Sequence, residues 1–411
     1  MGKGSGDPVN PTPHDQLRDR LPAELLSRTA DGLLVVSPSS TGQVAEVLAL
    51  SHEVGWKVAV RGAGTWTPTD APCDLVVSTV GLTAIPRVSP ADLTATVETG
   101  VPLDTLQQRL AANGAWLPLD PPGHPGRTLG SVLATATAGA LQHSRGTPRE
   151  LTLGCTVVTG DGRVVTAGGA VVKNVAGYDL TRLQIGGFGA FGILTEVHLR
   201  LRALPESDRT LLLTGRRDQL TRCARHLAEI HLDAAAIELA SPDASGTEEW
   251  MLLVRLLGSA AGTEAEAARV REAADTPVSE LSPEKSRPLR QTIALSFLSL
   301  PGTIRLGVLP DGVDDVLDLV AEKLGEGPIT AGPASGGIRI GADPDPDTIH
   351  HLRRSLAERE IPLTVERAPW ALRSRTGHFG AYREGVGALV TGLRSSFDPT
   401  GTLVVPRDTL A

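Results

Sequence analysis

The stretch Gly168–Leu201, which reads GGAVVKNVAGYDLTRLQIGGFGAFGILTEVHLRL, joins a glycine-rich segment to a regularly alternating one. Four glycines fall within Gly186–Gly192, where the backbone must approach another group closely or adopt a positive φ. The residues that follow alternate in character, which is typical of a half-buried β-strand. One side of that strand carries Ile193, Thr195, Val197, Leu199 and Leu201, and the other carries Leu194, Glu196, His198 and Arg200.

The segment Gly187–Gly192 also fits the pattern G-x-G-x-x-G of dinucleotide-binding βαβ units. That motif needs a strand before it and the N-terminus of a helix after it, because the helix dipole holds the pyrophosphate. Here a predicted strand follows the last glycine. We therefore reject a Rossmann interpretation of these glycines.

The composition limits the classes of function. With 411 residues, the chain is long enough for two or three domains with buried cores. Its net charge of −8 argues against nucleic acid or an anionic membrane as a main partner. No apolar run approaches the ~18 residues that cross a bilayer, so we predict no membrane span. The polar start lacks the apolar core of a signal peptide, and we predict a disordered tail over residues 1–30.

The three cysteines, Cys73, Cys155 and Cys223, are scattered and form no C-x-x-C motif. Such usage is typical of a reducing compartment, so we predict a cytoplasmic protein. It also excludes an iron–sulfur cluster or a cysteine zinc site within the chain.

Local patterns divide the chain near Pro205. Before it, we predict a helix that begins at Thr41 as N-cap and ends at Gly55, and a hairpin of Cys155–Thr159 with Arg163–Ala167. Beyond Pro205, strand-like and helix-like segments alternate, which favours an α+β domain with an antiparallel sheet and helices on one face. The Pro- and Ser-rich segment Asp275–Pro288 is predicted as a loop within it.

The segment Arg61–Thr65, RGAGT, follows a predicted strand and precedes no clear helix. Small residues let successive backbone N–H groups form a concave nest that binds phosphate oxygens without a helix dipole. The alternative is an ordinary β-turn. Two further segments poor in large side chains follow in the sequence, Thr128–Thr137 and Gly186–Gly192.

In this order, the three segments resemble the FAD-binding (PCMH-type) domain of the vanillyl-alcohol oxidase superfamily, and more closely the FAD-binding subunit of glycolate oxidase. The resemblance covers about residues 33–401. It depends on RGAGT, ETGVPLDTLQQRLAANG (Glu98–Gly114), LPLDPPG (Leu117–Gly123), TLGSVLAT (Thr128–Thr135), RGTPRELTLG (Arg145–Gly154), VVKNVAGYDLTRL (Val171–Leu183), GILTEV (Gly192–Val197) and FDPTG (Phe397–Gly401).

The resemblance implies an α+β fold with two domains. Residues 31–205 would form a two-subdomain PCMH-type FAD-binding domain. Residues 206–411 would form an α+β cap domain with an antiparallel sheet, whose C-terminal segment returns towards the FAD-binding domain.

The resemblance also implies a set of FAD-binding residues. The first loop would hold the pyrophosphate, the second segment and the Arg149/Gly154 region would surround the flavin and ribitol, and backbone near Ile193 would meet the adenine end. Asn174 either donates to a flavin edge or caps a turn, and Tyr178 either contacts the cofactor or pairs with Asp179. The set comprises Arg61, Gly62, Ala63, Gly64, Thr65, Pro121, Thr128, Gly130, Ser131, Thr135, Arg149, Gly154, Asn174, Tyr178, Gly192 and Ile193.

Attachment of the FAD is expected to be non-covalent. Relatives with covalent flavin carry a histidine or cysteine in or near the first loop, and this chain has Trp66 there. The indole of Trp66 either stacks on the cofactor or serves only in packing.

The implied chemistry is oxidation of a small 2-hydroxy acid, such as glycolate or D-lactate, with the flavin accepting a hydride. Such a site needs a cation for the carboxylate and a base for the hydroxyl. No histidine pattern reproduces the metal motif of related enzymes, so we predict no metal, and no catalytic base is identified. Candidates for the cation are Arg145, Arg149, Arg339 and Arg373.

Three functions remain open from the sequence. The chain could be the flavin subunit of a complex with a second flavoprotein and an iron–sulfur subunit, because no cluster can form within it. It could instead be a self-sufficient FAD oxidoreductase on another alcohol. The third alternative is a non-catalytic or electron-relaying accessory subunit.

Overall fold

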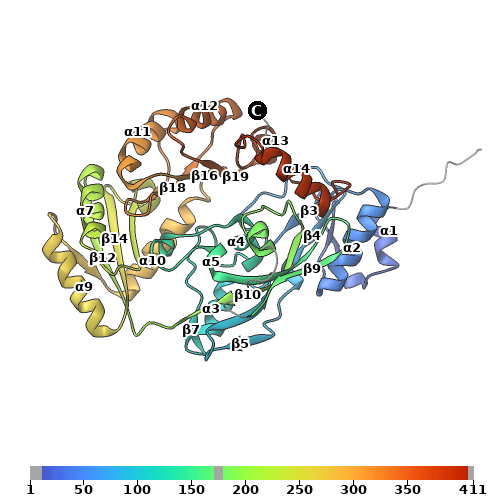
Figure 1. Ribbon diagram of the computed structural model, residues 1–411, viewed down its shortest axis with the longest axis horizontal. Helices are drawn as coiled ribbons and strands as arrows, with labels where there is room; N and C mark the ends of the chain where they lie inside the picture. Colours follow the sequence, from blue (N-terminus) through green and yellow to red (C-terminus); the bar gives the residue numbers. More distant parts are fainter. Residues whose placement is uncertain (1–11, 171–178, 406–411) are drawn as a thin grey trace, which may run out of the picture.

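The computed structural model describes residues 12–170 and 179–405, and Figure 1 shows how they divide into two halves. The N-terminal half, on the right of the view, holds small sheets, and residues after 206 form one large sheet on the left. The predicted α+β fold class is confirmed. Asn174 and Tyr178 lie outside the described residues.

The first sheet has the strand order β1-β2-β4-β3. Strands β2, β4 and β3 are parallel, and β1 pairs antiparallel with β2. Helix α2 (Thr41–Val54) is capped by Ser40, not by the predicted Thr41, because the Ser40 hydroxyl accepts from the backbone N–H of Gln43. Gly55 ends the helix at φ 85°, as predicted. The strands are β1 (Leu26–Arg28), β2 (Leu34–Val36), β3 (Val58–Arg61) and β4 (Leu75–Ser78).

The prediction of a disordered tail is wrong for its described part. Residues after Thr12 form α1 (Pro13–Arg18) and the 3-10 helix η1 (Ala23–Leu25), which lead into β1. Leu17 and Leu21 are buried in the core of the first sheet. Leu21 lies beyond the end of α1, but its backbone N–H donates to the carbonyl of Leu17, so both side chains reach the same core. This short segment therefore gains more from burial than its polar composition suggests.

The second sheet has the order β5-β6-β10-β8-β9 and is antiparallel throughout. Its central strand, β10 (Ile193–Arg200), is the alternating segment of the sequence, and Val197 and Leu199 are fully buried. Strands β8 and β9 form the predicted hairpin. The other strands are β5 (Arg87–Ser89), β6 (Thr94–Glu98), β8 (Thr152–Val158) and β9 (Val164–Gly168), and β7 (Ala115–Trp116) pairs with β11 (Arg202–Ala203) in a separate ribbon.

Short helices cover the second sheet. Helix α3 follows Pro102, which occupies its N-cap position, and α4 begins within the Thr128–Thr137 segment. They pack through Leu106, Leu110, Val132 and Leu133 into the core around β10. The helices are α3 (Leu103–Ala111), α4 (Leu129–Thr135), α5 (Pro148–Leu151) and α6 (Leu180–Gln184), with the 3-10 turns η2 (Thr79–Gly81) and η3 (Ala140–His143).

The third sheet has eight strands in the order β15-β12-β14-β13-β17-β18-β16-β19, all antiparallel. Its antiparallel character was predicted correctly. The strands are β12 (Ser207–Gly215), β13 (Ala236–Ala240), β14 (Trp250–Gly258), β15 (Ser279–Leu281), β16 (Gly302–Gly307), β17 (Ile329–Gly332), β18 (Gly337–Ala342) and β19 (Leu363–Arg367).

Helices lie on both faces of this sheet, which corrects the one-sided arrangement that we predicted. In β14, Leu252 and Val254 face the helices of one side, while Met251 and Leu253 face α8 and α10 on the other. Helix α10 also corrects the loop predicted over residues 275–288, because Pro283 begins the helix at a position where a missing N–H costs nothing. The first side is covered by α7 (Arg217–Glu229), α9 (Ala260–Ala273), α11 (Val313–Leu324) and α12 (Pro346–Ala357), and the second by α8 (Pro242–Ser245) and α10 (Pro283–Ser296).

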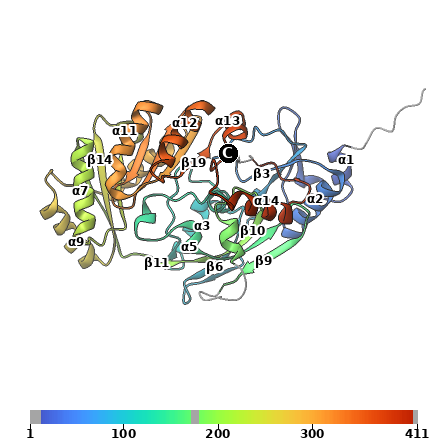
Figure 2. The ribbon, with the colours of Figure 1, turned by 45° about the horizontal axis from the view of Figure 1, so that its top comes forward.

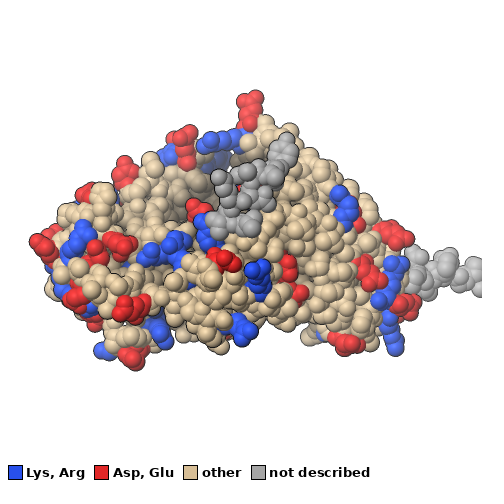
Figure 3. All heavy atoms as spheres, turned by 60° about the horizontal axis from the view of Figure 1, so that its bottom comes forward, with Lys and Arg blue, Asp and Glu red and all other residues tan. Residues whose placement is uncertain are grey.

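The end of the chain returns to the first sheet. Helices α13 (Trp370–Thr376) and α14 (Val386–Phe397) follow β19, and Figure 2 shows α14 over the N-terminal half. Phe397 contacts Phe191 edge to face, and Leu403 then forms a parallel bridge with Val58 of β3. Within the described residues, no helix is both long and apolar enough to cross a membrane. Basic and acidic residues are interspersed on the face shown in Figure 3.

Candidate functional site

A cleft lies where the three glycine-containing segments meet. Its empty volume, open solvent included, is about 1200 Å³. The first loop, α4 and the entry to β10 all contribute walls, although they are far apart in the sequence. The predicted FAD-binding residues that line it are Arg61, Gly62, Ala63, Gly64, Thr65, Gly130, Ser131, Thr135, Gly192 and Ile193.

Three glycines of the cleft stand where neighbouring protein atoms leave no room for a Cβ. A Cβ on Gly62 would overlap the side chain of Thr128, and one on Gly130 would come within 2.9 Å of Thr99 Cβ. At Gly192 a Cβ would lie 2.5 Å from a methyl group of Val157 on the neighbouring strand β8. These glycines therefore allow the three segments to converge.

Two threonines hold the convergence in place. The Thr128 hydroxyl accepts from the backbone N–H of Ser131 and caps α4, so the side chain that contacts Gly62 is itself fixed. The backbone N–H of Gly130 donates to the carbonyl of Thr99 at 2.8 Å. The Thr99 hydroxyl donates to the carbonyl of Leu194 at 2.6 Å, which connects α4 to the start of β10.

Two other glycines are open towards the cleft. Gly64 has φ 71° and Gly189 has φ 78°, in the left-handed region that a Cβ disfavours. No other atom lies within 4 Å of where their Cβ atoms would stand. The open backbone at these points can approach a ligand as closely as its own atoms allow. This wall is suited to a large ligand with a diphosphate, such as FAD, because backbone N–H groups in such loops bind phosphate oxygens.

Four predicted residues do not line the cleft. Thr128 supports Gly62 from behind, and Arg149 donates through Nη2 to the carbonyl of Ile185 at 3.0 Å, beside the glycine-rich segment. Gly154 lies in β8 against Gly168 of β9, where a Cβ would overlap the hairpin backbone. Pro121 belongs to the loop that follows β7. Their proposed contacts with a cofactor stay predictions, as do those of the other residues of the set.

Sequence reasoning missed a buried histidine in the cleft wall. His378 is 5% exposed, its ring stacks on Phe188 at 3.9 Å between centroids, and both residues line the cleft. The imidazole Nδ1 donates to the carbonyl of Val365 at 2.6 Å, which assigns the tautomer with an unprotonated Nε2 in the neutral ring. Its signal in the sequence is an isolated G-H-F-G at Gly377–Gly380, which forms no histidine pair.

Arg373 also lines the cleft, but protein groups already satisfy much of its guanidinium. Its Nη2 donates to the carbonyl of Pro68 and pairs with Asp70 at 3.0 Å, and its Nε donates to the carbonyl of Ala368. Burial lowers its pKa, and the carboxylate of Asp70 opposes that shift. Of the four arginines considered for substrate, this one connects α13 to the loop after Trp66.

Trp66 is packed between two cations. Its ring is 3% exposed, with the guanidinium of Arg127 at 4.3 Å and that of Arg367 at 5.8 Å from its centroid. Arg127 is itself 1% exposed and donates through Nη2 to Ser131, Thr135 and Thr137. Burial lowers the pKa of Arg127 to about 9, so it stays protonated at neutral pH. The indole is thus enclosed largely by protein, although it borders the cleft.

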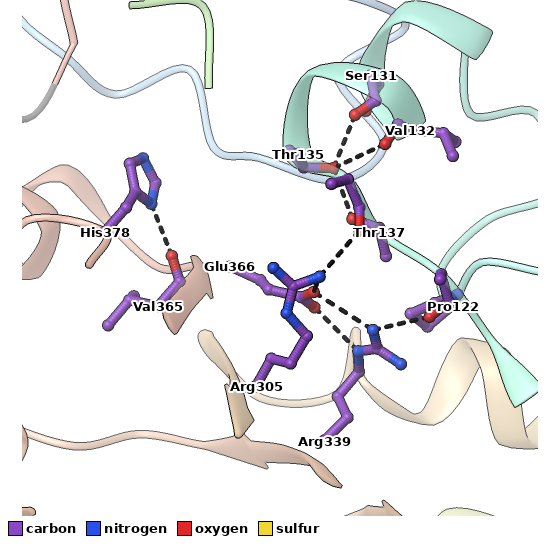
Figure 4. Close-up of polar contacts among 12 residues, drawn as sticks. Pro122, Ser131, Val132, Thr135, Thr137, Arg305, Arg339, Val365, Glu366 and His378 are labelled. Atoms are coloured by element: carbon purple, nitrogen blue, oxygen red, sulfur yellow. Dashed lines mark hydrogen bonds and ion pairs between the residues drawn. The ribbon is translucent and has the colours of Figure 1, made fainter. Parts of the chain in front are cut away.

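Figure 4 shows the charged cluster that joins the two halves behind the cleft. Glu366 of β19 is fully buried and accepts from Nε and Nη2 of Arg339 at 2.9 and 3.3 Å, and it pairs with Nη1 of Arg305 at 3.2 Å. The same arginines donate to the carbonyls of Ala136 and Ala138 just after α4. Although burial opposes it, the two guanidinium groups hold the pKa of Glu366 below its usual value.

A second cavity opens on the other side of this cluster, over the eight-stranded sheet. Its empty volume, open solvent included, is about 2190 Å³. Arg305, Arg339 and Glu238 are among the residues that line it. Burial, reinforced by the nearby Asp120, raises the pKa of Glu238 to about 8. Burial also raises the pKa of Asp120 to about 6, against the attraction of Arg255.

The described part of the chain contains no group of three or more histidine, cysteine or acidic side chains that could hold a metal ion. All three cysteines are free thiols, and burial raises the pKa of each. They are therefore poor nucleophiles and poor metal ligands at neutral pH.

Comparison with known proteins gives a consistent picture. Residues 33–179 match the family of FAD binding domains. The chain is 33% identical over 243 residues to the glycolate oxidase subunit GlcE of Escherichia coli (strain K12), an alignment that covers 58% of this chain and 64% of the relative. It is 32% identical over 183 residues to the glycolate oxidase subunit GlcD of Bacillus subtilis (strain 168), which covers 43% and 38%. It is also 32% identical over 198 residues to a D-lactate dehydrogenase of Archaeoglobus fulgidus, which covers 46% and 43%.

The chain spans less than two thirds of the length of each of these curated relatives. A solved structure of alkyldihydroxyacetonephosphate synthase superposes with a TM-score of 0.71 at 14% identity, and it covers 98% of this chain and 86% of the other. At that identity the superposition shows the fold alone, and it extends over both halves of the molecule.

Proposed function

We propose that the chain, whose residues 33–179 match the family of FAD binding domains, is the FAD-binding subunit of a dehydrogenase that oxidises a small 2-hydroxy acid. The observation that carries this proposal is the meeting of the three glycine-containing segments at one cleft. We further propose residues 31–205 as the FAD-binding domain and residues 206–411 as a cap over it.

The residues of this chain have separate tasks in the proposed reaction. FAD, when bound, supplies the acceptor for two electrons from the substrate. Backbone groups of Arg61–Thr65 would hold its diphosphate, and Gly64 and Gly189 would leave room for close approach. His378 is the proposed proton acceptor for the substrate hydroxyl, since its donated hydrogen bond to Val365 leaves the basic nitrogen at Nε2.

We propose glycolate or D-lactate as substrate because the relatives include glycolate oxidase subunits and a D-lactate dehydrogenase. We also propose that electrons leave to a second flavoprotein subunit and an iron–sulfur subunit. Two relatives are named as subunits of glycolate oxidase, and the three separated cysteines of this chain offer no cluster site of their own.

We propose that the FAD is bound non-covalently, because the first loop carries Trp66 in place of a nucleophilic side chain and no cysteine lines the described cleft. Denaturation in acid followed by filtration tests this directly. Yellow colour in the filtrate is the expected result, whereas colour that stays with the protein contradicts it.

The function is tested by an anaerobic absorbance spectrum of the purified yellow chain mixed with glycolate, D-lactate and other hydroxy acids, with and without the proposed partner subunits. Bleaching of the flavin by a 2-hydroxy acid is the expected result. A chain that cannot be loaded with FAD, or a flavin that no hydroxy acid bleaches under either condition, contradicts the proposal.

The role of His378 is tested by His378→Asn, whose amide can still donate to Val365 but has no basic nitrogen. We expect bleaching to slow by about a hundredfold while FAD stays bound. His198→Asn is the control, since His198 also bonds through Nδ1 but to Thr96 in the second sheet. Equal rates for the two variants would exclude His378 as the proton acceptor.

A further inference from the structure

Four polar residues stand at one level across the eight-stranded sheet. Thr330 of β17 pairs with Arg339 of β18, Arg339 pairs with Arg305 of β16, and Arg305 pairs with Thr364 of β19. Direct cross-strand partners project from the same face of a sheet. All four line the second cavity, and we call them the polar row.

The polar row interrupts a sheet that is otherwise built for apolar packing. Neighbouring residues of the same strands, such as Ile304, Ile340 and Val365, point the other way into the core beneath α11 and α12. Thr330 is 5% and Thr364 9% exposed, and neither side chain makes a hydrogen bond to protein within the described residues. Both residues line the cavity, so their hydroxyl groups can bond to a ligand or to solvent there.

The charges of the polar row do not cancel. Two guanidinium groups share the single carboxylate of Glu366, which leaves one positive charge in excess. Another carboxyl group that lines the cavity, that of Glu238, has its pKa raised to about 8 and is largely uncharged at neutral pH. An anion in the cavity would therefore meet a net positive floor.

Part of each guanidinium is free to meet such an anion. Arg305 uses only Nη1 for its bonds to Glu366 and the carbonyl of Ala136, and Arg339 uses Nε and Nη2 for Glu366 and the carbonyl of Ala138. Within the described residues, Nε and Nη2 of Arg305 and Nη1 of Arg339 have no protein partner. The arginines therefore do more than connect the two halves.

We propose that the polar row binds the carboxylate of a small organic acid, with Arg305 as the main cation and Thr364 as a hydroxyl donor. The site itself does not rest on the proposed function. Arg305 bonds to Ala136, and the preceding residue, Thr135, lines the cofactor cleft, although none of the described residues lines both cavities. Whether the bound acid is the oxidised substrate, which would rest on the proposed function, or a separate effector acid is decided by competition with the hydroxy acid that reduces the flavin. The rim carries Asp311, Asp315 and Glu360, which would repel large polyanions.

The test is calorimetric titration of the full chain, loaded with FAD and free of it, with oxalate, a dicarboxylate that has no hydroxyl to oxidise. Arg305→Gln is expected to weaken oxalate binding about tenfold or more, because a charge-assisted hydrogen bond is lost. Arg359→Gln is the matched control. Arg359 lines the same cavity but is exposed outside the polar row, so we expect less than a twofold change.

Thr364→Val keeps the shape of the side chain and removes the hydroxyl, so it separates binding from folding. We expect it to weaken oxalate binding about threefold to tenfold with an unchanged Tm. Absence of oxalate binding at 10 mM (roughly the limit of a useful site), or equal effects of the Arg305 and Arg359 variants, would overturn the proposal.

Two further arms distinguish the sources of the carboxylate. If oxalate competes with the hydroxy acid that bleaches the flavin, the polar row holds the substrate. If oxalate binds but changes bleaching without competing, the polar row holds a separate effector acid. Oxalate binding to a chain whose flavin no hydroxy acid reduces would support the site while the proposed function fails.

Discussion

The cofactor cleft and the polar row line different cavities, and they are built in opposite ways. The cleft is lined by backbone and small side chains such as Gly64 and Gly189, brought together by close packing. The polar row is made of long and branched side chains from four strands, and its Arg305 and Arg339 both form ion pairs with the buried Glu366. As proposed, the first would bind a ligand by leaving space for it, and the second by placing charge near it.

This difference predicts whether a substitution in each region affects ligand binding or folding. A side chain added to the cleft removes binding while the fold survives, because the open glycines contact nothing. A charge removed from the cluster behind the polar row should damage folding first, because buried ions depend on one another. Four predictions test this contrast.

The largest effect is expected for Gly64→Val. A β-branched residue is strained at φ 71°, and its methyl groups would project into the cleft, so we expect loss of FAD retention. The flavin-to-protein absorbance ratio after gel filtration measures it. Gly246→Val is the control, because Gly246 has φ 74° and the same open surroundings but lies outside the cleft. Equal FAD loss in both variants would mean that strain alone explains the effect.

The next effect is expected for Glu366→Gln. Removing the shared negative charge leaves the buried Arg339 and the half-buried Arg305 without a counter-charge, and we expect the free energy of unfolding to fall by about 3–5 kcal/mol. Urea denaturation measures it. Glu360→Gln on the exposed rim should change stability by less than about 0.5 kcal/mol. A small loss for Glu366→Gln would mean that the cluster is solvated.

A smaller, pH-dependent effect is expected for Glu238→Gln. The folded-state pKa of Glu238 is raised from 4.5 to about 8, so between these values the folded chain binds more protons than the unfolded chain. The ionisation of Glu238 therefore lowers the free energy of unfolding as the pH rises from about 4.5 to about 8. The variant should gain about 1–2 kcal/mol over the wild type between pH 5 and pH 8, and no more above it. Urea midpoints at pH 5, 6.5 and 8 measure the gap, and a constant gap contradicts the assignment.

The smallest effect is expected for Thr128→Val. Loss of the N-cap of α4 should cost about 1 kcal/mol and weaken FAD binding a few-fold, since Thr128 also fixes Gly62. Ser259→Ala removes the N-cap of α9 and serves as the control. It should cost similar stability and leave FAD affinity unchanged, as measured by urea denaturation and fluorescence titration. FAD affinity lowered equally in both variants would contradict the specific role of Thr128.

Local patterns predicted much of the first region. The alternation after Gly192 gave β10, and the turn chemistry around Asp161 gave the β8–β9 hairpin. The predictions were wrong where a segment of polar composition contains a few side chains that become buried. Leu17 and Leu21 bury themselves in a segment that reads as a tail, and α10 begins inside a Pro- and Ser-rich stretch because Pro283 suits a helix start.

The candidate residues divide in the same way. Glycines such as Gly64 can be recognised in sequence because their role is local, a backbone conformation that other residues avoid. The sequence could not identify His378 as a site residue. Its orientation depends on stacking against Phe188 and on the hydrogen bond to Val365, and both residues contact it only in the folded chain. Arg339 was one candidate among four, and nothing in the sequence joined it to Arg305.

The sequence by itself determined the segments that can leave space for a nucleotide, because backbone freedom is a property of each glycine and its neighbours. Only the tertiary structure decided which charges meet, because the register of β16, β17, β18 and β19 sets Thr330, Arg339, Arg305 and Thr364 side by side. Cross-strand pairing acts between residues distant in the chain, and a shift of one residue would turn each side chain to the opposite face.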